Sequence, residues 1–194
     1  KKIDSVQVDA RTVNDVKVSA DGKISIISRE GASNRRNGIV ILDTTDPYNV
    51  KIISEYTTNL TGGVHNLFIY DDHVYALSNG ERFYVINIED PFSPYEVGMF
   101  EIGEKGQAIH DVWIEDGIAY SSNWKHGVYM IDVGNGVAGG SPSNPVAIAN
   151  YSYESGAHHA TFPFKSKSTD KFYTILGDEI FPQGIDVYTT NETA

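Results

Sequence analysis

Three histidines occupy matching places in this sequence and are its best candidates for chemistry. His65, His110 and His159 each stand at the start of an apolar stretch, and the intervals between them are 45 and 49 residues. A neutral imidazole offers a ring nitrogen to a metal ion or to a hydrogen-bonded ligand. If these places belong to a repeated unit, the three side chains should look toward one common site.

Charged and aromatic residues near the histidines could complete such a site. Asp111 follows His110 directly, and the Asp178-Glu179 pair falls in an expected loop that could approach His159. Because adjacent strand residues point to opposite faces, only one of His158 and His159 can face the site, and we choose His159. The predicted ligand-binding set is His65, His110, His159, Asp111, Asp178, Glu179, Arg29 and Trp124, with His65, His110 and His159 as metal ligands.

The donor set limits the choice of metal. The chain has no cysteine, so thiolate sites and disulfides are excluded. Histidine and carboxylate ligands suit zinc, copper, iron or manganese. Acidic turns such as Asp71-Asp72 could hold calcium, but no EF-hand spacing is present and solvated turns are the simpler interpretation.

A repeated unit positions these residues. Each copy has a polar residue, an apolar strand, an acidic turn, a second strand, a loop and a third strand. Three copies begin VNDVKVSADGKISI at 13, VHNLFIYDDHVYAL at 64 and IHDVWIEDGIAYSS at 109, and a looser fourth copy begins at His158. The expected repeats span approximately 13–56, 64–102, 109–151 and 157–188.

Each repeat offers four short β-signals and no long helical periodicity. The third signals, at 39–42, 83–86 and 128–131, are continuously apolar, as expected for strands buried on both faces. Four-stranded antiparallel sheets repeated at about 45 residues describe a β-propeller, with a solenoid as the main rival. We predict an all-β propeller of about four blades.

The two ends leave two interpretations of the ring. Residues 1–10 are predicted to be the outer strand of a neighbouring blade, while the fourth copy stops after GIDVY at 184–188 without its own outer strand. Either the N-terminal strand completes the last blade and closes a ring of four, or the chain is part of a larger propeller. The abrupt ending favours the larger propeller.

The aligned repeats resemble the LVIVD-repeat β-propeller proteins of bacteria and archaea. The resemblance is carried by REGASNRRNGIVILDTTDP (29–47), GGVHNLFIYDDHVYAL (62–77), HDVWIEDGIAYSSNWKHGVYMIDVGNG (110–136) and HHATFPFKSKSTDKFYTILGDEIFP (158–182). It implies a larger propeller and an extracellular, periplasmic or cell-surface location, but no settled activity. The chain departs from the pattern at Asn14, which replaces the histidine, and at Gly134-Asn135, which replace Asp-Pro.

Structural roles compete with each functional interpretation. A polar residue that starts every inner strand can tie neighbouring blades together, and its repetition favours that role. Three imidazoles on separate inner strands could also lie too far apart to bind one ion. Asp178-Glu179 could be an exposed acidic turn. Trp124 could mark a contact surface or cover the edge of its own blade.

Charge and missing motifs narrow the function. The 26 acidic and 15 basic side chains give a net charge of −11, which disfavours nucleic acid as a partner. No apolar run is long enough for membrane insertion by this segment. Phosphate-loop, GxSxG and HExxH signatures are missing. We predict an exported, non-catalytic recognition or scaffolding module for a protein or small polar ligand; the alternative is a metal- or cofactor-dependent enzyme.

Overall fold

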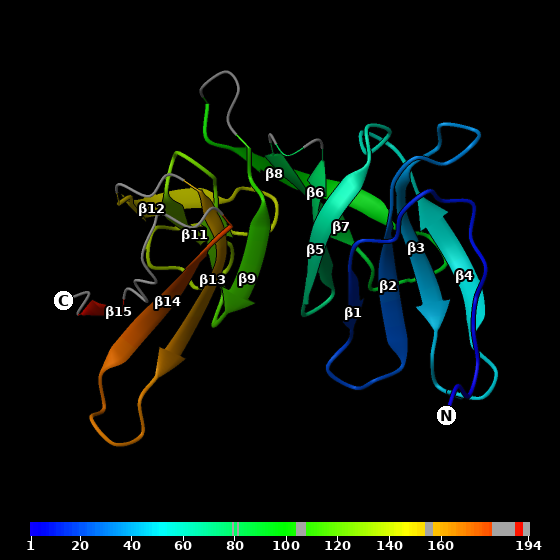
Figure 1. Ribbon diagram of the computed structural model, residues 1–194, viewed down its shortest axis with the longest axis horizontal. Helices are drawn as coiled ribbons and strands as arrows, with labels where there is room; N and C mark the ends of the chain where they lie inside the picture. Colours follow the sequence, from blue (N-terminus) through cyan, green and yellow to red (C-terminus); the bar gives the residue numbers. More distant parts are fainter. Residues whose placement is uncertain (79, 81, 104–107, 154–156, 180–188, 192–194) are drawn as a thin grey trace. The chain divides into compact units, whose positions relative to one another are not determined.

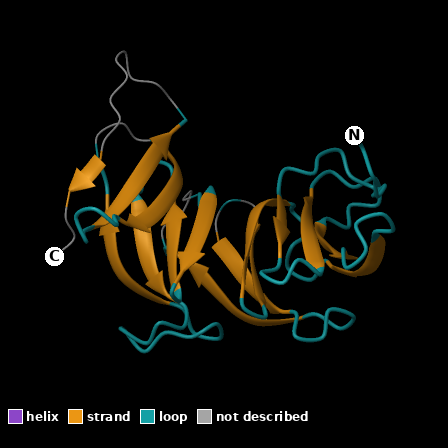
Figure 2. Cartoon of the chain, turned by 90° about the horizontal axis from the view of Figure 1, so that it is seen from below, coloured by secondary structure: helices purple, strands orange, loops and turns teal. Residues whose placement is uncertain are grey.

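The chain is all-β, as predicted. The computed structural model describes residues 1–78, 80, 82–103, 108–153, 157–179 and 189–191. These residues form fifteen β-strands and contain no helix, as Figure 2 shows. Within that part of the chain, no helix could therefore serve as a membrane span. The chain divides into two compact units, residues 1–101 and 102–194.

The first unit contains two antiparallel meanders, each with its four strands in chain order (Figure 1). The first sheet comprises β1 (Val16–Val18), β2 (Ile24–Arg29), β3 (Gly38–Asp43) and β4 (Lys51–Tyr56). The second sheet comprises β5 (Val64–Tyr70), β6 (His73–Ser78), β7 (Arg82–Asn87) and β8 (Tyr95–Glu101).

The second unit contains a further four-stranded meander and a sheet with three described strands. The third sheet comprises β9 (Asp111–Glu115), β10 (Ile118–Ser122), β11 (Val128–Asp132) and β12 (Val146–Tyr151). The last sheet comprises β13 (His158–Lys165), β14 (Phe172–Asp178) and β15 (Thr189–Asn191). The predicted strand at 184–188 lies outside the described residues.

Local sequence explains the hairpins. The acidic turns fall between the first two strands of the first three sheets, where Asp71 and Asp116 adopt left-handed conformations with φ of 49° and 50°. Gly117 has a φ of 71°, and a Cβ at this position would lie 2.4 Å from the backbone nitrogen of Asn135. Only glycine fits there without a backbone shift.

The first strands of successive sheets bring neighbouring blades together within each unit. In the first unit, β5 contacts both β1 and β2, and the two sheets bury one shared apolar core. In the second unit, β13 contacts β9 and β10. Successive four-stranded meanders that bury one another's faces are consistent with a four-blade propeller-like fold.

The N-terminal segment differs from its prediction. Residues 1–10 contain no strand. Instead, the side chain of Asp4 accepts a hydrogen bond from the Val50 amide at 2.7 Å, and the Asp9 carboxylate accepts bonds from the Ser33 amide and hydroxyl. Carboxylates, rather than a ladder of backbone hydrogen bonds, therefore hold this segment on the first sheet.

Candidate metal centre

Three side chains of the second unit converge on one point. The ligand atoms of His110, His159 and Glu179 all lie within 4.8 Å of one another. Glu179 Oε2 is 3.8 Å from His159 Nε2 and 4.0 Å from His110 Nε2. Ligands bound to one Zn²⁺ at about 2.0–2.2 Å can be at most roughly 4 Å apart. A small contraction would therefore let these residues hold a metal.

Two inner strands and one strand end position this group. His110 directly precedes β9, His159 lies on β13, and Glu179 follows β14, where its amide donates a hydrogen bond to the carbonyl of Ala157 at 3.1 Å. The rings of His110 and His159 have centroids 4.2 Å apart. The ligands thus come from two successive sheets of the second unit.

A backbone contact selects the tautomer of His110. Its Nδ1 lies 3.3 Å from the carbonyl oxygen of His159, and because a carbonyl can only accept, Nδ1 carries the proton. In the neutral ring, the nitrogen with a lone pair for a metal is then Nε2, which lies 4.0 Å from Glu179 Oε2. Metal-binding histidines commonly donate their second nitrogen to a carbonyl in this way. The donor set therefore fits a transition metal better than calcium, which prefers oxygen ligands.

Trp124 forms one wall beside His110, with ring centroids 4.8 Å apart at 87°. Its backbone is left-handed, with a φ of 47°, a conformation that costs a non-glycine residue about 1–2 kcal/mol. The amide of Trp124 donates to the carbonyl of His158 at 3.2 Å, and the amide of His158 donates back at 3.1 Å. Trp124 therefore bridges to the next blade instead of only covering its own.

The two adjacent histidines of β13 have different roles. The side chain of His159 belongs to the metal-capable group, whereas His158 is buried and donates from Nδ1 to the carbonyl of Trp124 at 2.5 Å. Its Nε2 accepts a hydrogen bond from the amide of Tyr153 at 3.4 Å. The sequence analysis did not predict these hydrogen bonds of the His158 ring, although the adjacent strand positions indicated that one of the two histidines must face away from the site.

His65 belongs to the first unit and is not part of this group. The Asn14 side-chain amide donates to His65 Nδ1 at 3.2 Å, and Glu30 Oε1 lies 3.6 Å from the same nitrogen. Asn14 and His65 occupy the repeat positions of His110 and His159, with an amide in place of one imidazole. Glu30, however, follows β2 of the earlier sheet, whereas Glu179 follows β14 of the later sheet. The departure at Asn14 therefore leaves one histidine fewer at this position of the first unit.

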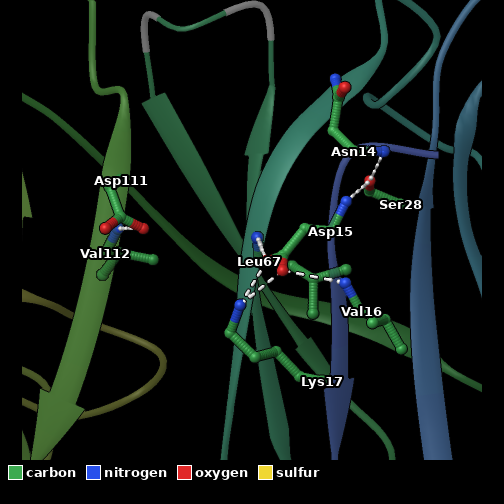
Figure 3. A network of polar contacts seen from close by, with 8 residues as sticks. All are labelled: Asn14, Asp15, Val16, Lys17, Ser28, Leu67, Asp111 and Val112. Atoms are coloured by element: carbon green, nitrogen blue, oxygen red, sulfur yellow. Dashed lines mark hydrogen bonds and ion pairs between the residues drawn. The ribbon is translucent and has the colours of Figure 1, made fainter. Parts of the chain in front are cut away.

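The residue after the first position ties blades together in the first unit (Figure 3). The carboxylate of Asp15 accepts a hydrogen bond from the amide of Leu67, on the next sheet, at 3.0 Å. It also pairs with the ammonium of Lys17, while the amide of Asp15 donates to Ser28 Oγ at 2.9 Å. Asp15 therefore joins two neighbouring sheets, which is the structural role considered for the polar residues at the start of each inner strand.

Asp111, Arg29 and Asp178 are not members of the group formed by His110, His159 and Glu179. Asp111 is on β9 and accepts a hydrogen bond from the amide of Val112 at 2.9 Å. Arg29 is buried in the first unit, where it donates to Glu55 Oε2 at 2.9 Å, as in a structural ion pair. Asp178 lies opposite His158 in the β13–β14 register and is not a member of the metal-capable group.

A buried carboxylate explains the departure at Gly134-Asn135. Asp132 accepts hydrogen bonds from the backbone amides of residues 134, 136, 138 and 140 at 2.7 to 3.1 Å. Burial alone raises the pKa of Asp132, but these four bonds outweigh it and hold the pKa well below its usual value. The loop that replaces Asp-Pro is wrapped around this side chain, which the sequence analysis did not single out.

Comparisons with known proteins support the fold alone. Neither a protein-family model nor a curated protein matches the sequence. The structure is similar to that of a Bacteroides fragilis protein whose suggested identity is 6-phosphogluconolactonase, with a TM-score of 0.65 and 12% identity over 97% of this chain. It is also similar to the C-terminal domain of Pseudomonas aeruginosa PilY1, with a TM-score of 0.51 and 15% identity over 81% of this chain. This chain spans 59% and 40% of those two chains.

Proposed function

We propose that the protein is an exported recognition module that binds a divalent transition metal between His110, His159 and Glu179. The observation that carries this proposal is the convergence of three ligand atoms within 4.8 Å on two packed sheets. Two imidazoles and one carboxylate are sufficient for tight binding of Zn²⁺, and they leave at least one coordination position for another group.

The surroundings favour a polar ligand at that open position. A divalent cation with one carboxylate ligand keeps a net positive charge, so it attracts an anionic or hydroxylated group. Trp124 adds an aromatic surface beside His110, suited to packing against the apolar part of such a ligand. The ligand can be a small molecule or a side chain of a protein partner, whereas a net charge of −11 opposes nucleic acid. The export of the protein is supported by its resemblance to surface propellers.

Calorimetric titration of the chelator-treated protein with Zn²⁺ tests the metal site. One ion per chain should bind, and His110→Ala, His159→Ala and Glu179→Gln should each weaken binding by roughly tenfold or more. His65→Ala is the matched control, because His65 also starts an inner strand but pairs with Asn14. Equal losses in the control, or unchanged binding in His159→Ala, would refute the assignment.

A gain of function in the first unit provides a second test. Asn14→His restores the imidazole beside His65 and Glu30, so the variant should bind a second Zn²⁺ ion. Its stoichiometry should then fall back to one when Glu30→Gln is added. A variant that stays folded by circular dichroism and binds a single ion would show that these repeat positions do not specify a metal site.

A metal-dependent enzyme is the second candidate function. It is favoured by the three-ligand site, because catalytic zinc sites keep a position for water or substrate. In the described structure, the buried Asp178 Oδ1 has no hydrogen-bond partner, and the residue precedes the ligand Glu179. Hydrolysis of a chromogenic ester by the Zn²⁺-loaded protein, lost in both His110→Ala and Asp178→Asn, would support this function over recognition.

A further inference from the structure

Asn135 and Gly136, in the loop after β11, form a sequence that is prone to spontaneous deamidation. Asparagine followed by glycine reacts readily because glycine has no Cβ to shield its backbone nitrogen. That nitrogen attacks the side-chain carbonyl carbon of the asparagine and loses its proton, and the side-chain nitrogen leaves as ammonia. Water then opens the resulting succinimide to aspartate or isoaspartate. Both residues are exposed, so water can reach this pair.

Two hydrogen bonds hold the groups that would react. The side-chain nitrogen of Asn135 donates to the carbonyl oxygen of Asp116 at 2.7 Å, and the amide of Gly136 donates to Asp132 Oδ1 at 3.0 Å. Ring closure takes the proton from the Gly136 nitrogen and expels the side-chain nitrogen of Asn135. The reaction therefore breaks both bonds, and each of them raises its cost.

The Asp132 carboxylate acts on this pair as a restraint and not as a base. It is fully buried and accepts hydrogen bonds from three further amides, those of residues 134, 138 and 140. Burial raises the pKa of Asp132, but the hydrogen bonds outweigh this effect and hold the pKa well below its usual value. A carboxylate with a low pKa is a poor proton acceptor. The Gly136 nitrogen is thus held in its protonated, unreactive form.

The same loop is attached to the turn between β9 and β10. The amides of Val133 and Asn135 donate to the carbonyl of Gly117 at 2.9 and 3.2 Å, beside the bond from Asn135 to Asp116. A carboxylate in place of the Asn135 amide has no N–H to donate. It would face the carbonyl oxygen of Asp116 and repel it, so deamidation should weaken the contact between the loop and the turn.

We propose that Asn135 is a site of spontaneous deamidation, that the Asp132 carboxylate restrains the reaction in the folded protein, and that the product releases the loop from the turn. A reaction that needs local opening proceeds at a rate set by the fraction of molecules that are open. The register pairs Asp132 with Ile118 beside the turn, whereas His110 precedes the other end of β9. The inference is therefore independent of the metal site.

Peptide mass spectrometry of protein incubated at mildly alkaline pH measures the reaction, since conversion of an amide to an acid changes the mass of the peptide. Asn135 should react roughly tenfold or more slowly in the folded wild type than in urea, because opening must break a hydrogen bond to a charged group. Asp132→Ala should remove most of this protection in the folded state. Asp132→Asn, which keeps one acceptor oxygen, should remove less.

Asn37 and Gly38 form a matched control pair. Asn37 is buried, its Oδ1 accepts a hydrogen bond from the amide of Ala32 at 2.9 Å, and its Nδ2 donates to the carbonyl of Thr61 at 2.7 Å. This pair should react slowly in the folded wild type and equally slowly in both Asp132 variants. Circular dichroism checks that each variant folds, and if Asp132→Ala does not, the milder Asp132→Asn carries the comparison.

Equal rates at Asn135 in folded and unfolded wild type would overturn the proposal, and so would a folded Asp132 variant that reacts as slowly as the wild type. Asn135→Asp tests the product. It should unfold at a lower urea concentration than Asn135→Ala, which removes the donor without adding a charge. An unfolding midpoint of Asn135→Asp equal to that of the wild type would contradict the release of the loop.

Discussion

Removing the Asp15 carboxylate should loosen the tie between the first two sheets. The side chain of Asp15 is only 16% exposed. It accepts a hydrogen bond from the amide of Leu67, which is a fully buried residue. A hydrogen bond to a charged group contributes about 1.5–3 kcal/mol, and a buried donor left without a partner costs about 1–3 kcal/mol. Because these two estimates describe one bond, we expect Asp15→Ala to destabilise the first unit by about 2–3 kcal/mol.

Native-state hydrogen exchange of the Leu67 amide is the most direct assay. Since 1.4 kcal/mol corresponds to a factor of ten, exchange of this amide should become roughly 30 to 150 times faster in Asp15→Ala. Asp15→Asn keeps an oxygen acceptor and should show a smaller effect. Lys17→Met removes the ion pair but not the tie, so its effect should stay within about 1 kcal/mol. Unchanged protection of Leu67 in Asp15→Ala would refute the reasoning.

Three further predictions concern single residues. The four amide hydrogen bonds lower the pKa of Asp132 in the folded state. The contribution of Asp132 to stability is therefore present above the unfolded pKa of about 3.9 and is lost as pH falls through the folded pKa. The difference in the free energy of unfolding between wild type and Asp132→Asn, measured by urea unfolding, should narrow below about pH 4. Burial raises the pKa of Tyr120 to about 12, so its stabilising contribution is present below about pH 10 and is lost as pH rises toward 12. Burial also raises the pKa of Tyr75 and of Tyr56, so ultraviolet titration should show several phenols that ionise later in the native chain than in the unfolded chain. Tyr120→Phe should remove one phenol from this late-ionising group and leave the number that ionises near pH 10 unchanged. Gly117→Ala should lower the melting temperature, because its Cβ would lie 2.4 Å from the backbone of Asn135. Gly22→Ala should lower the melting temperature less, because nothing lies within 4 Å of its Cβ. Equal losses in the two variants would indicate that the left-handed φ alone, and not the close contact, sets the cost.

Much of the fold was predictable because hydrophobic pattern and turns agree within each repeat. The continuous apolar runs at 39–42 and 83–86 correctly indicated central strands, because a strand between two covered faces needs apolar residues on both sides. Residues 1–10 have an alternating pattern but form no strand. Alternation predicts which side chains face a surface, and it cannot say whether a partner strand offers its backbone.

The candidate site was only partly readable from the sequence. The spacing of His110 and His159 was informative because both residues start inner strands of successive blades. Glu179 was less certain, since the position of a loop carboxylate depends on how the strand ends. The side chain of His158 bonds to the backbone carbonyl of Trp124, and that of Asp132 bonds to backbone amides. Such bonds to the backbone cannot be predicted from the spacing of residue types.

The ligands of the candidate metal centre come from two separate sheets, and this has a consequence for how the second unit responds to its surroundings. A metal ion held by His110 on one side and by His159 and Glu179 on the other would act as a removable cross-link. Because binding to the folded state raises its stability by mass action, the docking of the last sheet would then vary with the concentration of free metal. The rigidity of this unit would report the metal content of the compartment in which the protein resides.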